Sequence, residues 1–161
     1  MTDATYLNKG GLYNTQGRIV QAHVLSSVGS AGQRTCLGWF RANGANYLHI
    51  KTNAGGSSSQ MHKFEYDGYT YSSHNVHNSV TFYTYSGTTT PYEPSLVNWG
   101  ETTGGIVNYY YSSSDDKVVI VLQTSTSYTG GFLYHQSGSS HYTHTIDILA
   151  HTSSNSTSGV Y

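Results

Sequence analysis

The segment Lys117-Val118-Val119-Ile120-Val121-Leu122-Gln123 contains the longest uninterrupted apolar run of the chain. Most of its apolar residues are β-branched, which favours a strand. Because no polar residue alternates with them, we expect a central strand covered on both faces. The run is far shorter than the roughly 20 residues that a membrane-spanning helix needs. The sequence therefore predicts a sheet built around this strand, and no membrane insertion.

On either side of this run, short stretches of alternating apolar and polar residues are separated by clusters of Gly, Ser, Thr and Asn. In the stretch 47–51, Leu48 and Ile50 are expected to face the core, and Tyr47, His49 and Lys51 to face outward. The pattern predicts an all-β fold, an antiparallel β-sandwich of jelly-roll type with about nine short strands. The expected strands are 18–25, 35–41, 47–52, 61–69, 80–85, 106–111, 117–123, 131–135 and 144–150.

The length of 161 residues is typical of one domain. We expect an N-terminal arm or attachment segment over residues 1–17, a sandwich over 18–151 and a flexible C-terminal tail over 152–161. Frayed termini are the alternative for both ends. The first residues lack the basic and apolar regions of a secretory signal, so we expect either that a signal was removed or that export used another route.

Charged residues make up only 9% of the chain, against about 25% in an average protein. The formal charge is −1, and 14% of residues are aromatic, a combination that argues against disorder. Seven basic residues without a basic stripe do not provide the clustered positive charge that binds phosphates. We therefore expect no nucleic-acid partner.

The acidic residues are few and scattered, and no nucleophile elbow, phosphate loop or zinc-protease helix is present. The pair Asp115-Asp116 lies in a Ser-rich turn, which is typical of a solvated hairpin rather than of an acid–base pair. We expect no catalytic residues and no enzymatic activity.

Histidine and cysteine give no strong signal for a bound group. His74 with His77, and His141 with His144, are three residues apart, whereas ligands on one face of a strand are two apart. We expect hydrogen bonding at the surface, no metal and no cofactor, with a site shared between subunits as the alternative. Cys36 allows no intrachain disulfide, and its apolar neighbours predict a buried side chain rather than a reactive thiol.

Tyrosine is the positive signal, with 16 residues that are partly grouped. Alternation places Tyr83 with Tyr85, and Tyr109 with Tyr111, on shared strand faces. Such rows provide flat, rigid, amphipathic area of the kind found in antibody paratopes and sugar-stacking sites. The alternative is that cross-strand tyrosine pairs only stabilise the sheet.

The stretch from Gly87 to Glu101 contains Pro91 and Pro94 and is expected to be a long loop. Its Trp99 is the strongest single ligand candidate, and anchoring of the loop to the core is the alternative. Trp39, in an apolar strand, is expected in the core. The candidate ligand-binding residues are Trp99, Tyr92, Tyr109, Tyr111, Tyr83 and Tyr85.

The segment 47–53 (Tyr-Leu-His-Ile-Lys-Thr-Asn), followed by Met61, Phe64, Gly68-Tyr69 and Tyr71, resembles tail-fibre and other appendage proteins of marine tailed phages. The later segment 117–122, followed by Tyr128-Thr129-Gly130-Gly131-Phe132, fits the same type. The resemblance implies a β-structured module, commonly a homotrimer, that recognises host-surface sugars or protein. Assembly inside a lysing host would also account for the missing signal.

We therefore expect a non-enzymatic virion appendage protein on the virion surface or outside the cell. Its expected partners are further copies of itself, most simply in a trimer, other virion proteins, and a host-surface glycan or protein. Apolar residues make up 36% of the chain, more than one small sandwich needs to bury. The alternatives are a structural capsid or tail decoration protein, and a secreted carbohydrate-binding module.

Overall fold

The structure is a computed structural model that describes residues 12–13, 19–24, 27–29, 34–42, 47–55, 59–70, 74–85, 91–100, 104–123, 130–138, 142–144 and 146–152. These residues form strands and their connections and contain no helix, so the predicted all-β fold is confirmed. No helix in the described part of the chain could span a membrane. The strands are β1 (Leu12–Tyr13), β2 (Ile19–Val24), β3 (Ser27–Gly29), β4 (Thr35–Ala42), β5 (Tyr47–Thr52), β6 (Met61–Thr70), β7 (His74–Tyr83), β8 (Tyr92–Gly100), β9 (Gly105–Ser112), β10 (Lys117–Gln123), β11 (Gly130–Ser137), β12 (Tyr142–His144) and β13 (Ile146–Thr152).

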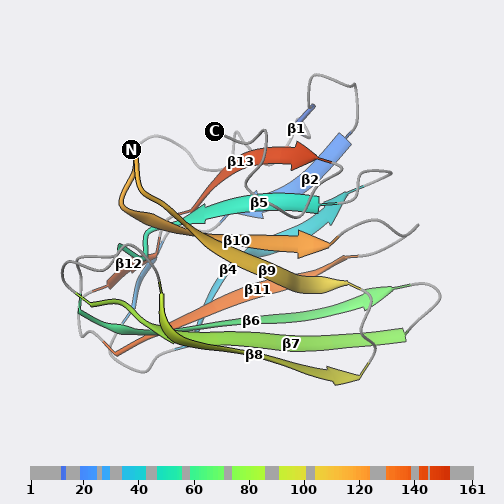
Figure 1. Cartoon of the computed structure of the whole chain (residues 1–161). Helices are drawn as coiled ribbons and strands as arrows, with labels where there is room; N and C mark the ends of the chain where they lie inside the picture. The colour runs from blue at the N-terminus through green and yellow to red at the C-terminus, as the bar shows by residue number, and fades with distance from the viewer. Residues whose placement is uncertain are drawn as a thin grey trace.

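Two antiparallel sheets of unequal width pack face to face (Figure 1). The seven-stranded sheet has the order β1-β2-β4-β11-β6-β7-β8, and the four-stranded sheet has the order β13-β5-β10-β9. Strands β12 and β3 form a separate antiparallel pair. The arrangement is the predicted sandwich, in which each sheet buries one face against the other.

The chain crosses repeatedly from one sheet to the other. Strand β11 returns between β4 and β6, and β10 returns between β5 and β9, an interleaving that jelly rolls share. The consecutive strands β6, β7 and β8 then lie side by side at one end of the seven-stranded sheet and make it wider than the four-stranded sheet. Because β9 at the margin of the four-stranded sheet packs against β6 and β7, strand β8 lies beyond the covered area (Figure 1).

Strand β10 lies in the middle of the four-stranded sheet, as its sequence predicts. Its residues Val118 to Leu122 are all fully buried. Val118, Ile120 and Leu122 join the core between the sheets, and Val119 and Val121 are buried on the opposite face. The core also contains Leu37, Phe40, Leu48, Ile50, Phe64, Val76, Val80, Phe82, Ile106 and Leu133.

Each of the nine predicted strands overlaps an observed one, but two predicted connections are wrong. Strand β7 begins at His74, six residues before the expected strand 80–85, so most of the connection implied between the strands 61–69 and 80–85 is itself strand. Strand β8 occupies most of the expected loop from Gly87 to Glu101. Its Pro94 is compatible with a strand because β8 is at the edge of the sheet, where a missing N–H breaks no ladder.

Three predictions of side-chain burial also need correction. His49 was expected to face outward, but it is fully buried, with Nδ1 3.1 Å from the Tyr110 hydroxyl. Cys36 and Trp39 were expected in the core, but both are only partly buried. On β4, Leu37 and Phe40 take the core positions instead.

Several expectations fall outside the described residues. These include most of the N-terminal arm, the tail beyond Thr152, and His141. Within the arm, Leu12 and Tyr13 pair with β2.

Candidate functional site

The candidate site lies on the face of the seven-stranded sheet that points away from the four-stranded sheet, hereafter the outer face. On β6, Phe64 and Tyr66 point into the core, so alternate residues such as Glu65 and Asp67 lie on the outer face. Residues directly opposite each other in an antiparallel pair share a face. The strand registers therefore place one row across five strands on the outer face: Trp39, Phe132, Asp67, His77 and Trp99.

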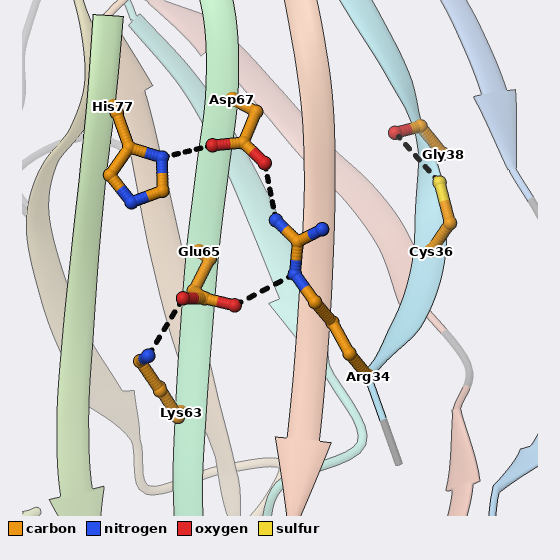
Figure 2. Close-up of polar contacts among 7 residues, drawn as sticks. All are labelled: Arg34, Cys36, Gly38, Lys63, Glu65, Asp67 and His77. Carbon is orange, nitrogen blue, oxygen red and sulfur yellow. Dashed lines mark hydrogen bonds and ion pairs between the residues drawn. The ribbon is translucent and has the colours of Figure 1, made fainter.

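An ionic cluster occupies the middle of the outer face (Figure 2). Arg34 Nε donates a hydrogen bond of 2.8 Å to Glu65 Oε2, and the guanidinium also pairs with Asp67. Lys63 Nζ lies 2.7 Å from the other Glu65 oxygen, and His77 Nδ1 contacts the other Asp67 oxygen. In a chain with so few charges, this gathering of five ionisable groups on one face defines a distinct polar site.

The arginine of this cluster is also held by an aromatic ring. The Arg34 guanidinium lies 3.5 Å from the centre of the Tyr134 ring, in cation–π geometry. The contact with the Tyr134 ring and the hydrogen bonds to two carboxylates therefore fix the Arg34 guanidinium in one position. The cluster is a preorganised set of donors and acceptors, not a group of freely moving charges.

The environment of the cluster keeps its carboxylates ionised. Burial alone would raise the pKa of Glu65, but hydrogen bonds and charge from Lys63 and Arg34 outweigh it and hold the pKa below its usual value. Burial also opposes ionisation of Asp67, whose pKa is nevertheless lowered by Arg34 and His77. Neither carboxyl group on this face is held protonated near neutral pH.

Aromatic side chains are exposed on both sides of the cluster. Trp99 is 48% exposed and its ring lies 5.0 Å from that of His77, while Phe132 is 45% exposed and lies 6.3 Å from Tyr134. The strands carrying Trp99 and Phe132 are three spacings apart, about 14 Å at the usual strand separation. Two exposed ring systems thus flank a fixed polar centre.

Other exposed apolar side chains gather on the same face. By strand register, Met61, Tyr69, Tyr92 and Val97 also belong to the outer face. The remaining large exposed apolar residues in the described part of the chain are Leu96, on the other side of β8, and Tyr85, which follows β7.

The structure brings three of the six predicted ligand-binding residues together, and Trp99 lies seven residues from Tyr92, about 23 Å along the same strand. Trp99 and Tyr92 lie on β8, Tyr83 lies opposite Tyr92 on β7, and Tyr85 follows with its ring 6.4 Å from that of Tyr83. The Tyr83 hydroxyl donates a hydrogen bond of 3.1 Å to the Ser59 carbonyl oxygen. Tyr83 and Tyr92 therefore lie at one end of the margin of the outer face that β7 and β8 form, and Trp99 lies near the other end.

Tyr109 and Tyr111 lie elsewhere, on β9 of the four-stranded sheet. Both are partly buried and pack against the core, and the Tyr109 ring lies 6.4 Å from that of Phe82. The Tyr111 hydroxyl donates to Asp116, which raises the pKa of Tyr111. The alternation on which the pair was predicted is correct, but the shared face is the inner one.

Phe132 and the ionic cluster were not among the predicted site residues. The alternation of Lys63, Glu65, Asp67 and Tyr69 along one predicted strand is a signal that could have revealed the charged face. No comparable signal marks Arg34, which is 31 residues from Glu65 in the sequence.

Among the described residues, no group of three or more His, Cys, Asp or Glu side chains is arranged so that it could hold a metal ion. His62 and His135 are both buried and their rings are linked, with Nδ1 of His62 3.0 Å from Nε2 of His135. Cys36 Sγ lies 3.8 Å from the Gly38 carbonyl oxygen, and burial raises the pKa of its thiol.

The lowered pKa values of Glu65 and Asp67 predict a pH-dependent contribution of Arg34 to stability. A carboxyl group with a folded-state pKa below its unfolded value stabilises the fold above about pH 4, and this stabilisation is lost as the pH falls through the folded-state pKa. We expect Arg34→Gln to lower the free energy of unfolding by about 1 kcal/mol at pH 7, because Arg34 is partly exposed and screened.

Urea unfolding of both proteins at pH 7 and at pH 3 checks this prediction. The difference between wild type and Arg34→Gln should shrink at pH 3, because the two carboxyl groups take up protons in the unfolded chain before they do in the folded protein. An equal difference at both pH values would show that Arg34 acts through packing and not through its charge.

Comparisons of the chain with protein-family models, with curated proteins and with solved structures found no match.

Proposed function

We propose that the protein is a non-enzymatic recognition module that binds an oligosaccharide on the outer face of the seven-stranded sheet. The observation that carries the proposal is the placement of exposed Trp99 and Phe132 on either side of the ionic cluster around Asp67. Both strands are paired with antiparallel neighbours at these residues, Phe132 with Trp39 and Asp67, and Trp99 with His77. The site is therefore rigid and open.

The two kinds of side chain suit the two kinds of surface on a sugar. Exposed aromatic planes stack on the apolar faces of sugar rings, while fixed carboxylates, guanidinium and imidazole groups hydrogen-bond to hydroxyl groups. The separation of about 14 Å between the strands of Trp99 and Phe132 fits a ligand of several sugar units. Because the cluster is already ordered by its own contacts, binding costs little conformational entropy.

The electrostatics of this face support binding rather than hydrolysis. A glycosidase needs one carboxyl group with a raised pKa to protonate the leaving oxygen. On the outer face the pKa values of both Glu65 and Asp67 are lowered, and both groups pair with Arg34. A carboxylate in this setting is an acceptor for ligand hydroxyls and a poor acid.

We place this binding in a virion appendage, where the ligand is a glycan on the host surface. The support for this setting is the resemblance of segments 47–53 and 117–122 to appendage proteins of tailed phages. As part of a virion appendage, the protein would be located on the virion surface. A secreted carbohydrate-binding module would use the outer face in the same way, and the choice between the two rests on which glycans bind.

The test is a glycan array that includes host-surface polysaccharides, probed with the wild-type protein, Trp99→Ala and Phe132→Ala. Loss of a stacking residue at an energetic hot spot costs about 2 kcal/mol or more, roughly thirtyfold in affinity. We expect each variant to lose binding to this extent while its circular dichroism spectrum stays that of the wild type.

Tyr47→Ala is the matched control, since Tyr47 is a partly exposed aromatic residue on the four-stranded sheet. Its affinity should equal that of the wild type. Wild-type affinity in both Trp99→Ala and Phe132→Ala, or a protein that binds no glycan, would refute the proposed function.

A further inference from the structure

Two histidines contact each other inside the core, at one end of the seven-stranded sheet. His62, near the start of β6, and His135, near the end of β11, are both fully buried. Nδ1 of His62 lies 3.0 Å from Nε2 of His135, and the planes of the two rings differ by only 16°. The two residues, hereafter the histidine pair, come from strands that are neighbours in the sheet.

Aromatic rings pack against the histidine pair. The His135 ring stacks on that of Phe64, with ring centres 4.2 Å apart, and the His62 ring lies 5.5 Å from that of Phe82 on β7. Phe64 and Phe82 both belong to the hydrophobic core. Because a charged group loses its hydration in such surroundings, the imidazolium form of either histidine is strongly disfavoured.

The hydrogen bonds around the pair determine where its protons lie. The Thr84 hydroxyl donates to the Gln60 carbonyl oxygen at 3.2 Å, so its oxygen can only accept from Nε2 of His62, which is 3.4 Å away. His62 then has no proton on Nδ1, and this atom accepts the N–H of His135 Nε2. The arrangement uses one proton on each ring, which is the neutral form of both histidines.

Among the described residues, no buried carboxylate faces the histidine pair. Glu65 is buried, but it lies on the outer face, where it pairs with Lys63 and Arg34. Asp116 accepts the hydroxyl proton of Tyr111 near the end of β9. Neither acidic group is placed to compensate a positive charge on the pair.

The other elements that pack around the pair present neutral groups to it. On β4, Thr35 lies opposite His135, and on β11 the Ser137 hydroxyl donates to Gln60 Oε1 at 3.2 Å. From β9, which packs against β6 and β7, Tyr109 lies against Phe82. A proton taken up by the closed pair would therefore be an uncompensated charge in the core.

The histidine pair lies where three strands end. Gln60 and Thr84 exchange backbone hydrogen bonds of 3.0 and 2.8 Å at the ends of β6 and β7, and the Gly138 N–H donates to the Met61 carbonyl oxygen at 3.0 Å beyond β11. Asn78, opposite a residue four positions along β6 from His62 and thus about 13 Å away, holds the same strands to β9. The end around the pair can therefore separate from the core while the part around Asn78 stays closed.

We propose that the histidine pair is a proton-sensitive switch. With both rings neutral, the pair holds the first residues of β6 and the last residues of β7 and β11 against the core, and proton uptake at mildly acidic pH opens this end of the sandwich. In the open state each ring is in water, where histidine has a pKa of about 6.5. The open state then binds more protons than the closed state, so a falling pH favours opening. The switch does not depend on the proposed glycan site.

Site-resolved amide hydrogen exchange of the full chain at pH 7.5 and pH 5.5, corrected for the intrinsic pH dependence of exchange, tests the switch. Each histidine that gains a proton only in the open state raises the opening equilibrium constant about tenfold over this range, so the pair raises it about a hundredfold. We expect this loss of protection at residues 59–64, 80–85 and 133–138. At pH 5.5 their protection should be at least about tenfold below that of Val118 to Leu122, which stay closed.

His135→Gln distinguishes proton uptake by the pair from other effects of acid. The glutamine amide still donates to Nδ1 of His62 but takes up no proton, so the response should fall from about a hundredfold to about tenfold. His77→Gln is the matched control, because it removes a partly exposed histidine from the outer face of β7 and should keep the hundredfold response. A response that comes from buried His49 would appear in β5 instead.

The ring signals of the wild-type histidines in nuclear magnetic resonance spectra provide a readout that needs no variant. Both rings of the pair should show neutral shifts, with the proton on Nε2, as long as this end is protected. Imidazolium shifts on either ring of the closed protein would overturn the proposal. So would unchanged protection at pH 5.5, equal protection of this end and of β10 at that pH, or the same pH response in His135→Gln as in the wild type.

Discussion

Gly131→Ala is expected to destabilise the protein by about 3 kcal/mol or more, which is a large fraction of the about 5–15 kcal/mol by which a typical domain is stable. A Cβ atom at this position would lie 2.5 Å from Cζ of Tyr66 and 2.6 Å from both the Asp67 carbonyl oxygen and the Gly68 Cα. Tyr66 is almost fully buried, and the other two atoms belong to the backbone of the paired strand β6. A close-packed core offers these atoms no space to move aside.

Thermal and urea unfolding measure this effect, with Gly138→Ala as the matched control. At Gly138, just beyond the same strand, the nearest atoms to an added Cβ lie at 3.9 Å, an ordinary contact distance. We expect Gly138→Ala to unfold like the wild type. A Gly131→Ala protein of wild-type stability would mean that Tyr66 does not pack against β11 as described.

Asn78→Leu is expected to cost about 3 kcal/mol, because Asn78 connects the two sheets through buried hydrogen bonds. Its Oδ1 accepts a bond of 2.9 Å from the Ile106 N–H, and its Nδ2 donates to the carbonyl oxygens of Gly104 and Ile106 at 3.1 and 3.2 Å. Leucine would leave these backbone groups without a partner inside the protein, and each such loss costs about 1–3 kcal/mol.

The local backbone is shaped around this amide. Gly105 adopts a φ of 71°, which favours glycine, and a Cβ there would lie 2.7 Å from the Asn78 amide. Asn75→Leu is the control, since Asn75 is an exposed residue of the same strand. Urea unfolding should show a large loss for Asn78→Leu and almost none for Asn75→Leu. Equal effects would contradict the role of Asn78 as a link between the sheets.

The central part of the fold could be predicted because its sequence pattern is compatible with only one kind of secondary structure. An apolar, mostly β-branched run such as Val118 to Leu122 favours a strand, and all of its side chains are removed from water only if that strand is covered on both faces. Strand β10 is such a strand. Alternation in the stretch 61–69 likewise identified β6 to within one residue. In both cases local pattern and tertiary environment agree.

The errors arise where tertiary context outweighs local pattern. Pro94 marks a loop in most sequences, but at the edge of a sheet it is tolerated within a strand. The first half of β7 is polar, and its strand character depends on partners in β6 and on the buried bonds of Asn78. A sequence alone does not show which strand will be an edge or which polar residue will find a buried partner.

The candidate site was only half predictable for a related reason. Trp99 and Tyr92 could be selected by residue type, and both lie on the outer face. Alternation shows which residues share a face of a strand but does not show which of the two faces is buried. For this reason Tyr109 and Tyr111 were expected to be exposed, although they pack against the core. Arg34 reaches Glu65 only because β11 pairs with both β4 and β6, a long-range arrangement.

Chemical-shift mapping tests the central claim most directly, because it identifies the surface that a bound glycan contacts. The amide signals of isotope-labelled protein would be followed during titration with the tightest-binding glycan from the array. We predict that the largest shifts occur at Asp67, His77, Trp99 and Phe132, which share one row of the outer face. Shifts centred on β5 and β10, with this row unchanged, would contradict the account.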